Sequence, residues 1–259
     1  MIKWSTLLLS LLLSTTVLAE TPQQRGLAIA TAADTADNGW GDSSATMVMT
    51  LRNRQGDTTQ RKIRNRQLEV KGDGDKSLTI FDSPNDVKGT AFLSHTHATR
   101  ADDQWLYLPA LKRVKRIASN NKSGPFMGSE FAYEDITSQE LAKYTYSWLK
   151  DEIYDGRESH VIERIPTYKH SGYTKQIVWI DTTMLQPLKI DFYDRKGALL
   201  KTLTSHEYQQ YKEKFWRPGR MEMVNHNNGK STTLSWTDYK FGNGFSKRDF
   251  DKNSLKRIR

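Results

Sequence analysis

Cysteine is absent from the 259 residues of this sequence. The chain can therefore form no disulfide bond, and it offers no cysteine of the kind to which bacterial lipoproteins attach their lipid. We expect a fold that is stabilised by packing alone and a protein that is not lipidated.

Long hydrophobic runs are also missing. The apolar run Leu7–Leu13 falls short of the roughly 20 residues that a membrane-spanning helix needs. It follows Lys3, and residues Met1–Ala19 as a whole have the charged start, apolar centre and small-residue end of a secretory signal peptide. We predict cleavage after Ala19, which leaves one soluble domain, residues 20–259, outside the cytoplasm.

The familiar catalytic motifs do not occur: there is no G-x-S-x-G elbow, H-E-x-x-H helix, P-loop or dinucleotide-binding glycine pattern. His95 and His97 would point the same way from a strand, but no other histidine stands at a spacing that completes a stable metal site. Asp73-Gly74-Asp75 resembles part of a calcium loop without the closing glutamate, so a turn is the better interpretation. The sequence predicts no metal, no cofactor and polar histidines at the surface.

Three neighbouring carboxylates, Glu130, Glu134 and Asp135, keep one enzymatic alternative open. Paired carboxylates can do acid–base chemistry, which would suit a hydrolase. No partnered nucleophile accompanies them, and the cations at 112–116 are close in sequence. We therefore expect Glu134 and Asp135 to pair with those cations, and we predict that the protein is not an enzyme.

Acidic residues are fewer than basic ones, 30 against 39, which gives a formal charge of +9. A basic surface favours anionic partners. After export these would be phospholipid or lipopolysaccharide head groups and not nucleic acid. Simple solubility is the other explanation for a moderate positive charge.

Helical patterns are scarce as well. One alanine-rich stretch, 21–38, has Pro22 near its start and Gly39 past its end, and a short terminal helix is expected at 246–258. Elsewhere, turn signals recur at short intervals, which indicates hairpins and an antiparallel sheet. A sheet of about ten or more strands should curl or close. The expected strands lie near 44–52, 58–70, 76–81, 89–99, 105–108, 111–117, 144–154, 158–165, 173–181, 187–194, 199–211, 217–225 and 231–240.

Several expected strands carry apolar residues on both faces. Val178-Trp179-Ile180 and the alternating series Leu188, Ile190 and Phe192 are the clearest examples. A strand of this kind needs cover on both sides. The sheet therefore either packs a complete core or keeps a cavity for an apolar ligand, and the residues alone leave both possibilities open.

Two groups of segments carry more specific information. W-L-Y-L-P-A-L-K-R-V-K-R-I at 105–117 is followed by G-P-F-M-G-S-E-F-A-Y-E-D at 124–135, and V-W-I-D at 178–181 by Q-P-L-K at 186–189. They resemble the signature of the LolA-like outer-membrane lipoprotein-sorting proteins, in particular the branch associated with RND/MMPL-type exporters. The resemblance implies a LolA/LolB-like fold that is mainly β with a few helices (α+β). In that fold a strongly curved antiparallel sheet forms an incomplete β-barrel covered by short helices.

The resemblance also implies a function. It indicates a periplasmic carrier that sequesters the acyl chains of a lipoprotein or phospholipid. The cargo would move between an inner-membrane RND/MMPL-like exporter and an outer-membrane acceptor. Exposure of an acyl chain to water costs roughly 25 cal/mol of free energy for each Å² of apolar surface, so a carrier must enclose the chain. The carrier must also release it, which requires a movable lid. We predict that the cavity is lined by Leu106, Leu108, Val178, Ile180, Leu188, Ile190 and Phe192, and that Phe126, Met127 and Phe131 form the lid.

The basic hairpin supports a second hypothesis. Lys112, Arg113, Lys115 and Arg116 are predicted to contact phosphate head groups or an acidic partner. If the hairpin is the functional element, the protein would be a non-enzymatic accessory protein that docks on an envelope RND-type complex and binds no lipid. Bound lipid would distinguish the two hypotheses.

Overall fold

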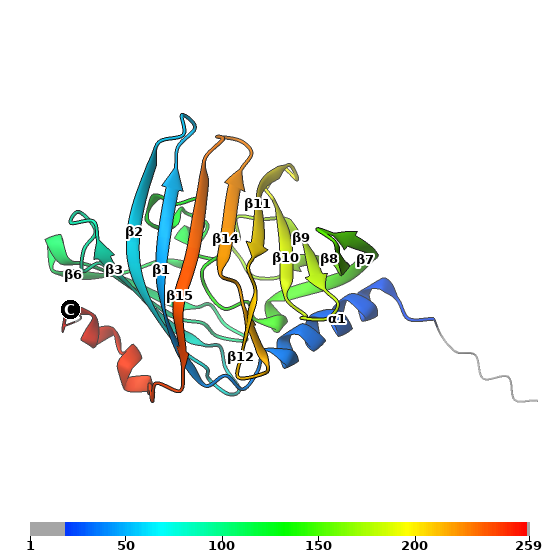
Figure 1. Ribbon diagram of the computed structural model, residues 1–259, viewed down its shortest axis with the longest axis horizontal. Helices are drawn as coiled ribbons and strands as arrows, with labels where there is room; N and C mark the ends of the chain where they lie inside the picture. The colour runs from blue at the N-terminus through cyan, green and yellow to red at the C-terminus, as the bar shows by residue number, and fades with distance from the viewer. Residues whose placement is uncertain (1–18, 258–259) are drawn as a thin grey trace, which may run out of the picture.

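One antiparallel sheet of 13 strands dominates residues 19–257, the part of the chain that the computed structural model describes (Figure 1). The predicted signal peptide therefore lies almost entirely outside the described residues. The strands of this sheet are β1 Asp42–Arg52, β2 Thr58–Leu68, β3 Lys76–Ser83, β4 Ala91–His95, β5 Asp103–Leu108, β6 Arg113–Arg116, β7 Tyr144–Tyr154, β8 Arg157–Pro166, β9 Lys175–Asp181, β10 Pro187–Tyr193, β11 Leu199–His206, β14 Arg220–Asn225 and β15 Ser231–Phe241.

The strand order is β6-β5-β4-β3-β2-β1-β15-β14-β11-β10-β9-β8-β7. Strand β1 pairs with β2 on one side and with β15 on the other, so the first and last strands of the sheet lie side by side in its middle. The end strands β6 and β7 do not pair with each other. The sheet is therefore curved but not closed, which confirms the expected fold class of an incomplete barrel with few helices.

Alternation along the strands sets the inner face. In β1, Ala45, Met47 and Met49 are buried while their neighbours are partly exposed. Strand β2 carries Ile63 inward and presents Lys62 and Arg64 on its other face, as the charge pattern of this strand predicted.

The N-terminal helix α1, Pro22–Ala36, packs across strand β7 at one end of the sheet (Figure 1). Thr21 caps it in a capping box with Gln24, and Pro22 occupies its first turn, so the predicted helix is confirmed. A Cβ at Gly26 would lie 2.6 Å from backbone atoms of Ser147 and Trp148. The glycine thus lets the helix backbone touch the strand backbone directly.

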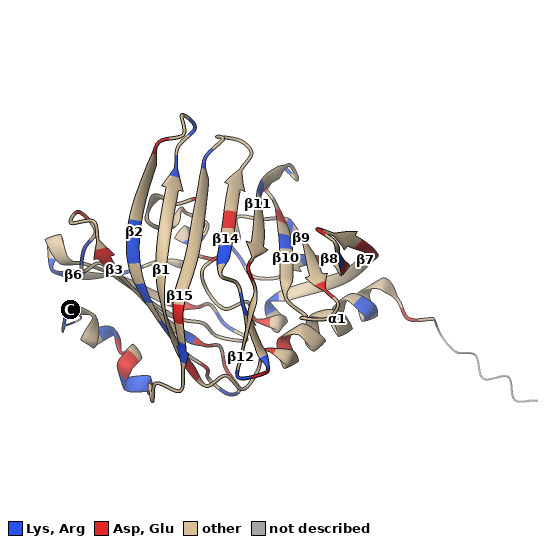
Figure 2. Ribbon diagram, in the orientation of Figure 1, with Lys and Arg blue, Asp and Glu red and all other residues tan. Residues whose placement is uncertain are grey.

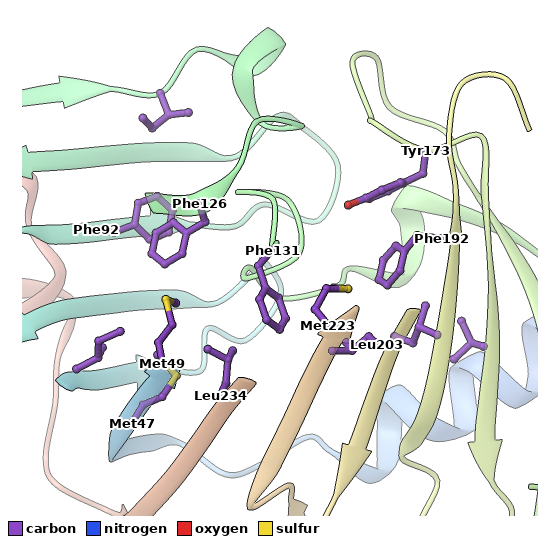
Figure 3. Packing of buried hydrophobic residues seen from close by; sticks show 14 of the residues in the cluster. Met47, Met49, Phe92, Phe126, Phe131, Tyr173, Phe192, Leu203, Met223 and Leu234 are labelled. Carbon is purple, nitrogen blue, oxygen red and sulfur yellow. The ribbon is translucent and has the colours of Figure 1, made fainter. Parts of the chain in front are cut away.

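The long connection between β6 and β7, residues 117–143, covers the inner face. It contains only the 3₁₀ turns η2 Ser119–Asn121, η3 Phe126–Gly128 and η4 Leu141–Lys143. Phe126 and Phe131 of this connection belong to the same buried cluster as Met49 of β1 and Phe192 of β10 (Figure 3). The cover of the cavity is therefore mostly irregular chain, with less helix than expected.

The C-terminus covers the opposite, outer face of β3–β6. Two 3₁₀ helices, η5 Lys247–Phe250 and η6 Lys252–Arg257, replace the expected single helix. Phe250 and Leu255 are fully buried there against Trp105 and Tyr107, in a second cluster separate from the inner one.

The prediction of one continuous strand at 199–211 was wrong. Residues 199–211 form not one strand but two, because Glu207 takes a left-handed conformation with φ 59° and ends β11. The chain then leaves the main sheet as a separate hairpin, β12 Gln209–Tyr211 with β13 Phe215–Arg217. In the described part of the chain, no helix has the length and apolar character needed to cross a membrane.

Candidate functional site

The inner face of the sheet encloses a cavity of about 1120 Å³. Its wall is made by strands from both halves of the sheet, by the C-terminal half of α1 and by the connection 117–143. Figure 3 shows apolar side chains converging on this space from both sides. The apolar side chains of the wall include Met47, Met49, Phe126, Phe131, Ile162, Val178, Ile180, Ile190, Phe192, Leu203, Met221 and Leu234.

Six of the ten residues predicted to contact lipid line this cavity. Val178 and Ile180 come from β9, Ile190 and Phe192 from β10, and all four are buried. The predicted lid residues Phe126 and Phe131 line it as well. Their role in binding lipid stays a prediction.

The other four predicted residues lie elsewhere. Leu106 of β5 belongs to the inner hydrophobic cluster, and Leu108 and Met127 pack against that cluster. None of the three lines the cavity. Leu188 lines a smaller neighbouring pocket of about 220 Å³, which shares Tyr208 and Trp216 with the main cavity.

Several lining residues were not predicted from the sequence. Met47 and Met49 alternate along β1, and that spacing alone predicts a common face. Leu203 of β11 and Leu234 of β15 alternate with threonine and serine in the same manner. Their strands are amphipathic, whereas the cavity residues predicted from sequence come from strands with two apolar faces.

Part of the inner cover, residues 122–136, spans the concave face, and we refer to it as the covering segment. On the side of β2–β5, the ring of Phe126 packs edge-on against Phe92, with 5.2 Å between centroids. The guanidinium of Arg61 donates to the carbonyl of Met127 at 2.5 Å, and the Gln104 amide donates to the carbonyl of Tyr133 at 3.3 Å. Apolar packing and hydrogen bonds thus fix one side of the segment to the N-terminal half of the sheet.

A buried ion pair fixes the segment to the other half. Lys201 Nζ of β11 lies 2.7 Å from Asp135 Oδ2, and the two side chains are only 5% and 3% exposed. Lys201 also donates to the carbonyl of Glu130 at 2.9 Å, while the Tyr173 hydroxyl donates to Asp135 at 2.8 Å. Every charged atom of this pair therefore has a partner of the right kind, which buried charges require.

Glu134 is held by fixed donors of the 168–172 loop. Its carboxylate accepts from the Tyr168 hydroxyl at 2.8 Å, the Ser171 hydroxyl at 2.9 Å and the Gly172 N–H at 2.7 Å. Burial raises the pKa of Glu134, while these hydrogen bonds act in the opposite direction. The expected pairing of Glu134 and Asp135 with the cations of 112–116 is thus wrong. The chain turns inward after β6 and carries both carboxylates away from that edge.

Glu130 completes the attachment of the segment. Its backbone N–H donates to Thr232 Oγ1 at 3.0 Å, and its carboxylate accepts from the Asn225 amide at 2.7 Å. All three carboxylates considered for acid–base chemistry are engaged by neighbouring donors of the fold. Their contacts explain how the segment is held in place.

Acidic residues gather at the rim of the cavity, where α1 ends and β2 leads into β3. Asp37 pairs with Arg217 of β13 at 2.5 Å and so connects the helix to the β12–β13 hairpin. Asp75 lies nearby, where burial first, and then the carboxylates of Glu140 and Glu69, raise its pKa to about 7. The rim is therefore polar while the wall is largely apolar.

The two histidines considered for metal binding are separated by their contacts. His95 Nε2 lies 2.7 Å from the carbonyl of Phe250, and His97 bridges Asp73 at 2.8 Å and Asp103 at 3.2 Å. His97 is buried, so the expectation of two surface histidines was wrong for this residue. Within residues 19–257, no group of three or more His, Cys, Asp or Glu side chains is arranged to hold a metal ion.

The predicted basic residues lie outside the cavity. Lys112 ends η1 (Pro109–Leu111) in a left-handed conformation, and Arg113, Lys115 and Arg116 lie exposed on β6. Arg116 pairs with Asp103 of the neighbouring strand at 2.5 Å. Head-group contact by these four residues remains a prediction.

The chain was compared with protein families and with curated proteins. A family model described as "Uncharacterized protein" matches residues 73–257. Comparison with curated proteins finds no match.

Several solved structures are similar to this chain in sequence and fold. The chain is 60% identical to an outer membrane lipoprotein-sorting protein domain from Vibrio parahaemolyticus, with a TM-score of 0.89 over 91% of this chain and 100% of that one. A DUF1329 family protein from Desulfovibrio piger is 29% identical, with a TM-score of 0.85 over 91% and 99% of the two chains. A LolA superfamily protein from Nitrosomonas europaea has the same fold at 20% identity, with a TM-score of 0.70 over 88% and 98%.

Proposed function

This chain belongs to the LolA-like family of outer-membrane lipoprotein-sorting proteins, and we propose that it is a periplasmic carrier for the acyl chains of a lipoprotein or lipid. The observation that carries the proposal is the cavity of about 1120 Å³ on the concave face of the open sheet. Its apolar wall is the surface that an acyl chain needs. The name of the relative from Vibrio parahaemolyticus supports a lipoprotein as cargo.

Size and energy are consistent with such a ligand. Pockets for small ligands commonly measure about 300–1,000 Å³, so this cavity has room for a long chain. Each buried CH₂ group contributes roughly 0.8 kcal/mol. Burial of a chain of about sixteen carbons therefore stabilises a complex by on the order of 10 kcal/mol before the costs of ordering. That is sufficient to keep the chain out of water during transit.

Release requires that the wall can open, and we assign this role to the covering segment. Phe126 and Phe131 occupy the inner side of the segment against the cavity, and Met127 lies between them in sequence. The segment has no helix longer than a single turn, so its position depends on side-chain contacts with the sheet. A cargo chain that displaces these rings would loosen the same contacts that hold the segment.

The proposed route runs from an inner-membrane RND/MMPL-like exporter to an outer-membrane acceptor. The residues of 105–117 and 124–135 support this branch of the family through their resemblance, and the signal peptide predicted at 1–19 supports the periplasm. Nucleic acid plays no part in the proposal. No catalytic step does either, because Glu130, Glu134 and Asp135 serve to hold the covering segment.

Uptake of a fluorescent fatty acid by the purified protein, followed by competition with an acylated peptide, tests the proposal. Ile190→Glu places a charge in the cavity wall and is expected to lower uptake at least tenfold, because an unpaired buried carboxylate opposes an apolar ligand. The matched control is Ile153→Glu on β7, where the isoleucine is 74% exposed and does not line the cavity.

The two variants separate the outcomes. Loss of uptake in Ile190→Glu with retention in Ile153→Glu supports the carrier, provided that both variants unfold cooperatively. Absence of uptake by the unaltered protein would contradict it and favour the accessory protein that docks on an envelope complex without lipid.

A further inference from the structure

Exposed cations of two separate segments lie at one end of the sheet, on either side of its last strand. Lys112, Arg113 and Lys115 lie on β6 and on the turn before it, and all three are exposed. Helix η6 contacts β4, β5 and β6 and brings three further exposed cations, Lys252, Lys256 and Arg257, to the same end. Figure 2 shows Lys and Arg on both elements near the C-terminus. We refer to these six residues as the basic edge.

Packing builds the basic edge into the fold. Phe250 and Leu255, on either side of Lys252, are fully buried on the outer face of β3–β6. Val114, between Arg113 and Lys115, packs against the same cluster. Arg113 and Lys115 alternate with Val114 and pair with Leu108 and Leu106, which pack on the inner side of the sheet, so they lie on the opposite face of β6 from η6. The cations of the basic edge therefore flank the end strand from both faces.

These charges are not neutralised within the protein. Among residues 19–257, no carboxylate oxygen lies within 4.0 Å of the charged nitrogens of the six cations, the limit for an ion pair. The contrast with nearby Arg100 and Arg116 is sharp, because both of these pair with Asp103, at 2.9 and 2.5 Å. Six unpaired positive charges thus remain available to an external partner.

Protection of a sheet edge explains only part of this pattern. Natural proteins place lysine on edge strands to prevent pairing with other strands, and this accounts for cations on β6. Lys252, Lys256 and Arg257 belong to a helix that packs on the face of the sheet, not on its edge. Their charge needs another explanation.

An exposed apolar residue stands among the cations. Leu111 is 62% exposed at the end of η1, directly before Lys112. The combination of basic residues with an apolar side chain at an exposed turn is typical of surfaces that bind the membrane interface.

We propose that the basic edge is a docking surface for an anionic phospholipid bilayer, separate from the cavity. A bilayer requires only an array of positive charge with an apolar tip. A protein partner of comparable affinity usually buries a central apolar patch. Neither of the two pockets described above includes any residue of the basic edge, and Leu111 is the single large apolar side chain exposed beside these cations in residues 19–257. The charge and shape therefore favour lipid over protein.

The expected strength follows from the number of charges. A basic residue near an anionic membrane surface changes binding by roughly fivefold, so removal of three should weaken it by about a hundredfold. Insertion of Leu111 should contribute roughly tenfold. The attraction should fall steeply as salt is raised, because the cations are exposed.

Flotation of residues 20–259 with lipid vesicles tests the proposal. The probes are vesicles of phosphatidylcholine alone and vesicles of equal parts phosphatidylcholine and phosphatidylglycerol. The test variant is Lys112→Gln/Arg113→Gln/Lys115→Gln. The matched control, Lys62→Gln/Lys196→Gln/Lys230→Gln, removes the same charge from exposed cations on β2 and on two hairpin turns.

Binding to the anionic vesicles alone, lost in the test variant and retained in the control, is the expected result. Lys256→Gln/Arg257→Gln should weaken binding by about thirtyfold, and Leu111→Ser by less. Equal binding of test and control variants would overturn the proposal, as would equal binding to neutral vesicles or none to either kind.

The outcome is independent of the carrier proposal. Ile190→Glu, which should abolish uptake of an acyl chain, is expected to bind anionic vesicles as the unaltered protein does, because Ile190 lies in the cavity wall. A protein that takes up lipid but ignores anionic vesicles would retain the carrier function and lose the docking surface.

Discussion

The buried ion pair between Asp135 and Lys201 offers a direct perturbation of the covering segment. Lys201→Met removes the cation and keeps a flexible side chain of similar length. It leaves the Asp135 carboxyl group buried without its cation, with the Tyr173 hydroxyl and the Ala132 N–H as its remaining donors. The backbone carbonyl of Glu130 loses its partner as well. Both effects destabilise the folded state because buried polar groups without partners are costly.

The size of the effect can be worked out from the contacts. Removal of one member of a buried ion pair typically costs about 3–5 kcal/mol. Two donors remain on Asp135, so we expect the lower end, about 3 kcal/mol. For a protein of this length, about 3 kcal/mol corresponds to a fall in Tm of roughly 6–12 °C.

Urea denaturation and hydrogen exchange of the covering segment are the assays. Lys150→Met is the matched control, because its pair with Glu152 is 57% and 32% exposed and should contribute little to stability. Exchange in residues 122–136 should accelerate in Lys201→Met more than elsewhere in the sheet. The double variant Asp135→Leu/Lys201→Met should recover much of the lost stability, since it leaves no unpaired charge. A loss in Lys201→Met no larger than in the control, with unchanged exchange, would refute this account of the segment.

Two further predictions concern the rim and the helix. Folding raises the pKa of Asp75 to about 7 from an ordinary value of 3.8, so its ionisation destabilises the folded state progressively as pH rises from about 4 to 7. Asp75→Asn should therefore raise the free energy of unfolding by about 1 to 3 kcal/mol at pH 8 and leave it nearly unchanged at pH 4. Urea titrations at the two pH values measure this difference, and an equal effect at both would contradict the prediction. Gly26→Ala should lower the free energy of unfolding by about 1 to 3 kcal/mol because the new Cβ would clash with the backbone of β7. A rise of about 1 kcal/mol in the free energy of unfolding, as Gly→Ala gives in an isolated helix, would show that α1 can move away from β7 without cost.

The parts of the fold that were predictable from sequence have local signals. Pro22 and the capping residue Thr21 mark the start of α1, and turn residues separate most strands. The alternation of Val178 with Ile180, and of Ile190 with Phe192, identified side chains that the structure places in the cavity wall. Each of these signals lies within a few residues of the feature that it predicts.

The contacts that were not predicted join distant parts of the chain. Asp135 and Lys201 are 66 residues apart, and nothing in either neighbourhood indicates the other. The sequence instead suggested the nearer cations at 112–116. Only the path of the chain across the concave face decides between them.

The rim shows the same limit of sequence reasoning. Asp37, Glu69, Asp75 and Glu140 come from four separate segments and form one acidic region only when α1 and the covering connection are in place. The raised pKa of Asp75 depends on that assembly. A short motif cannot encode such an arrangement.

The most direct test of the carrier is native mass spectrometry of residues 20–259, purified from a periplasm without detergent, followed by organic extraction of the bound material. The account predicts a bound lipid or acylated species that is absent from Ile190→Glu and present in Ile153→Glu. A protein that arrives without ligand, and that takes up neither phospholipid nor acylated peptide when these are supplied, would contradict it.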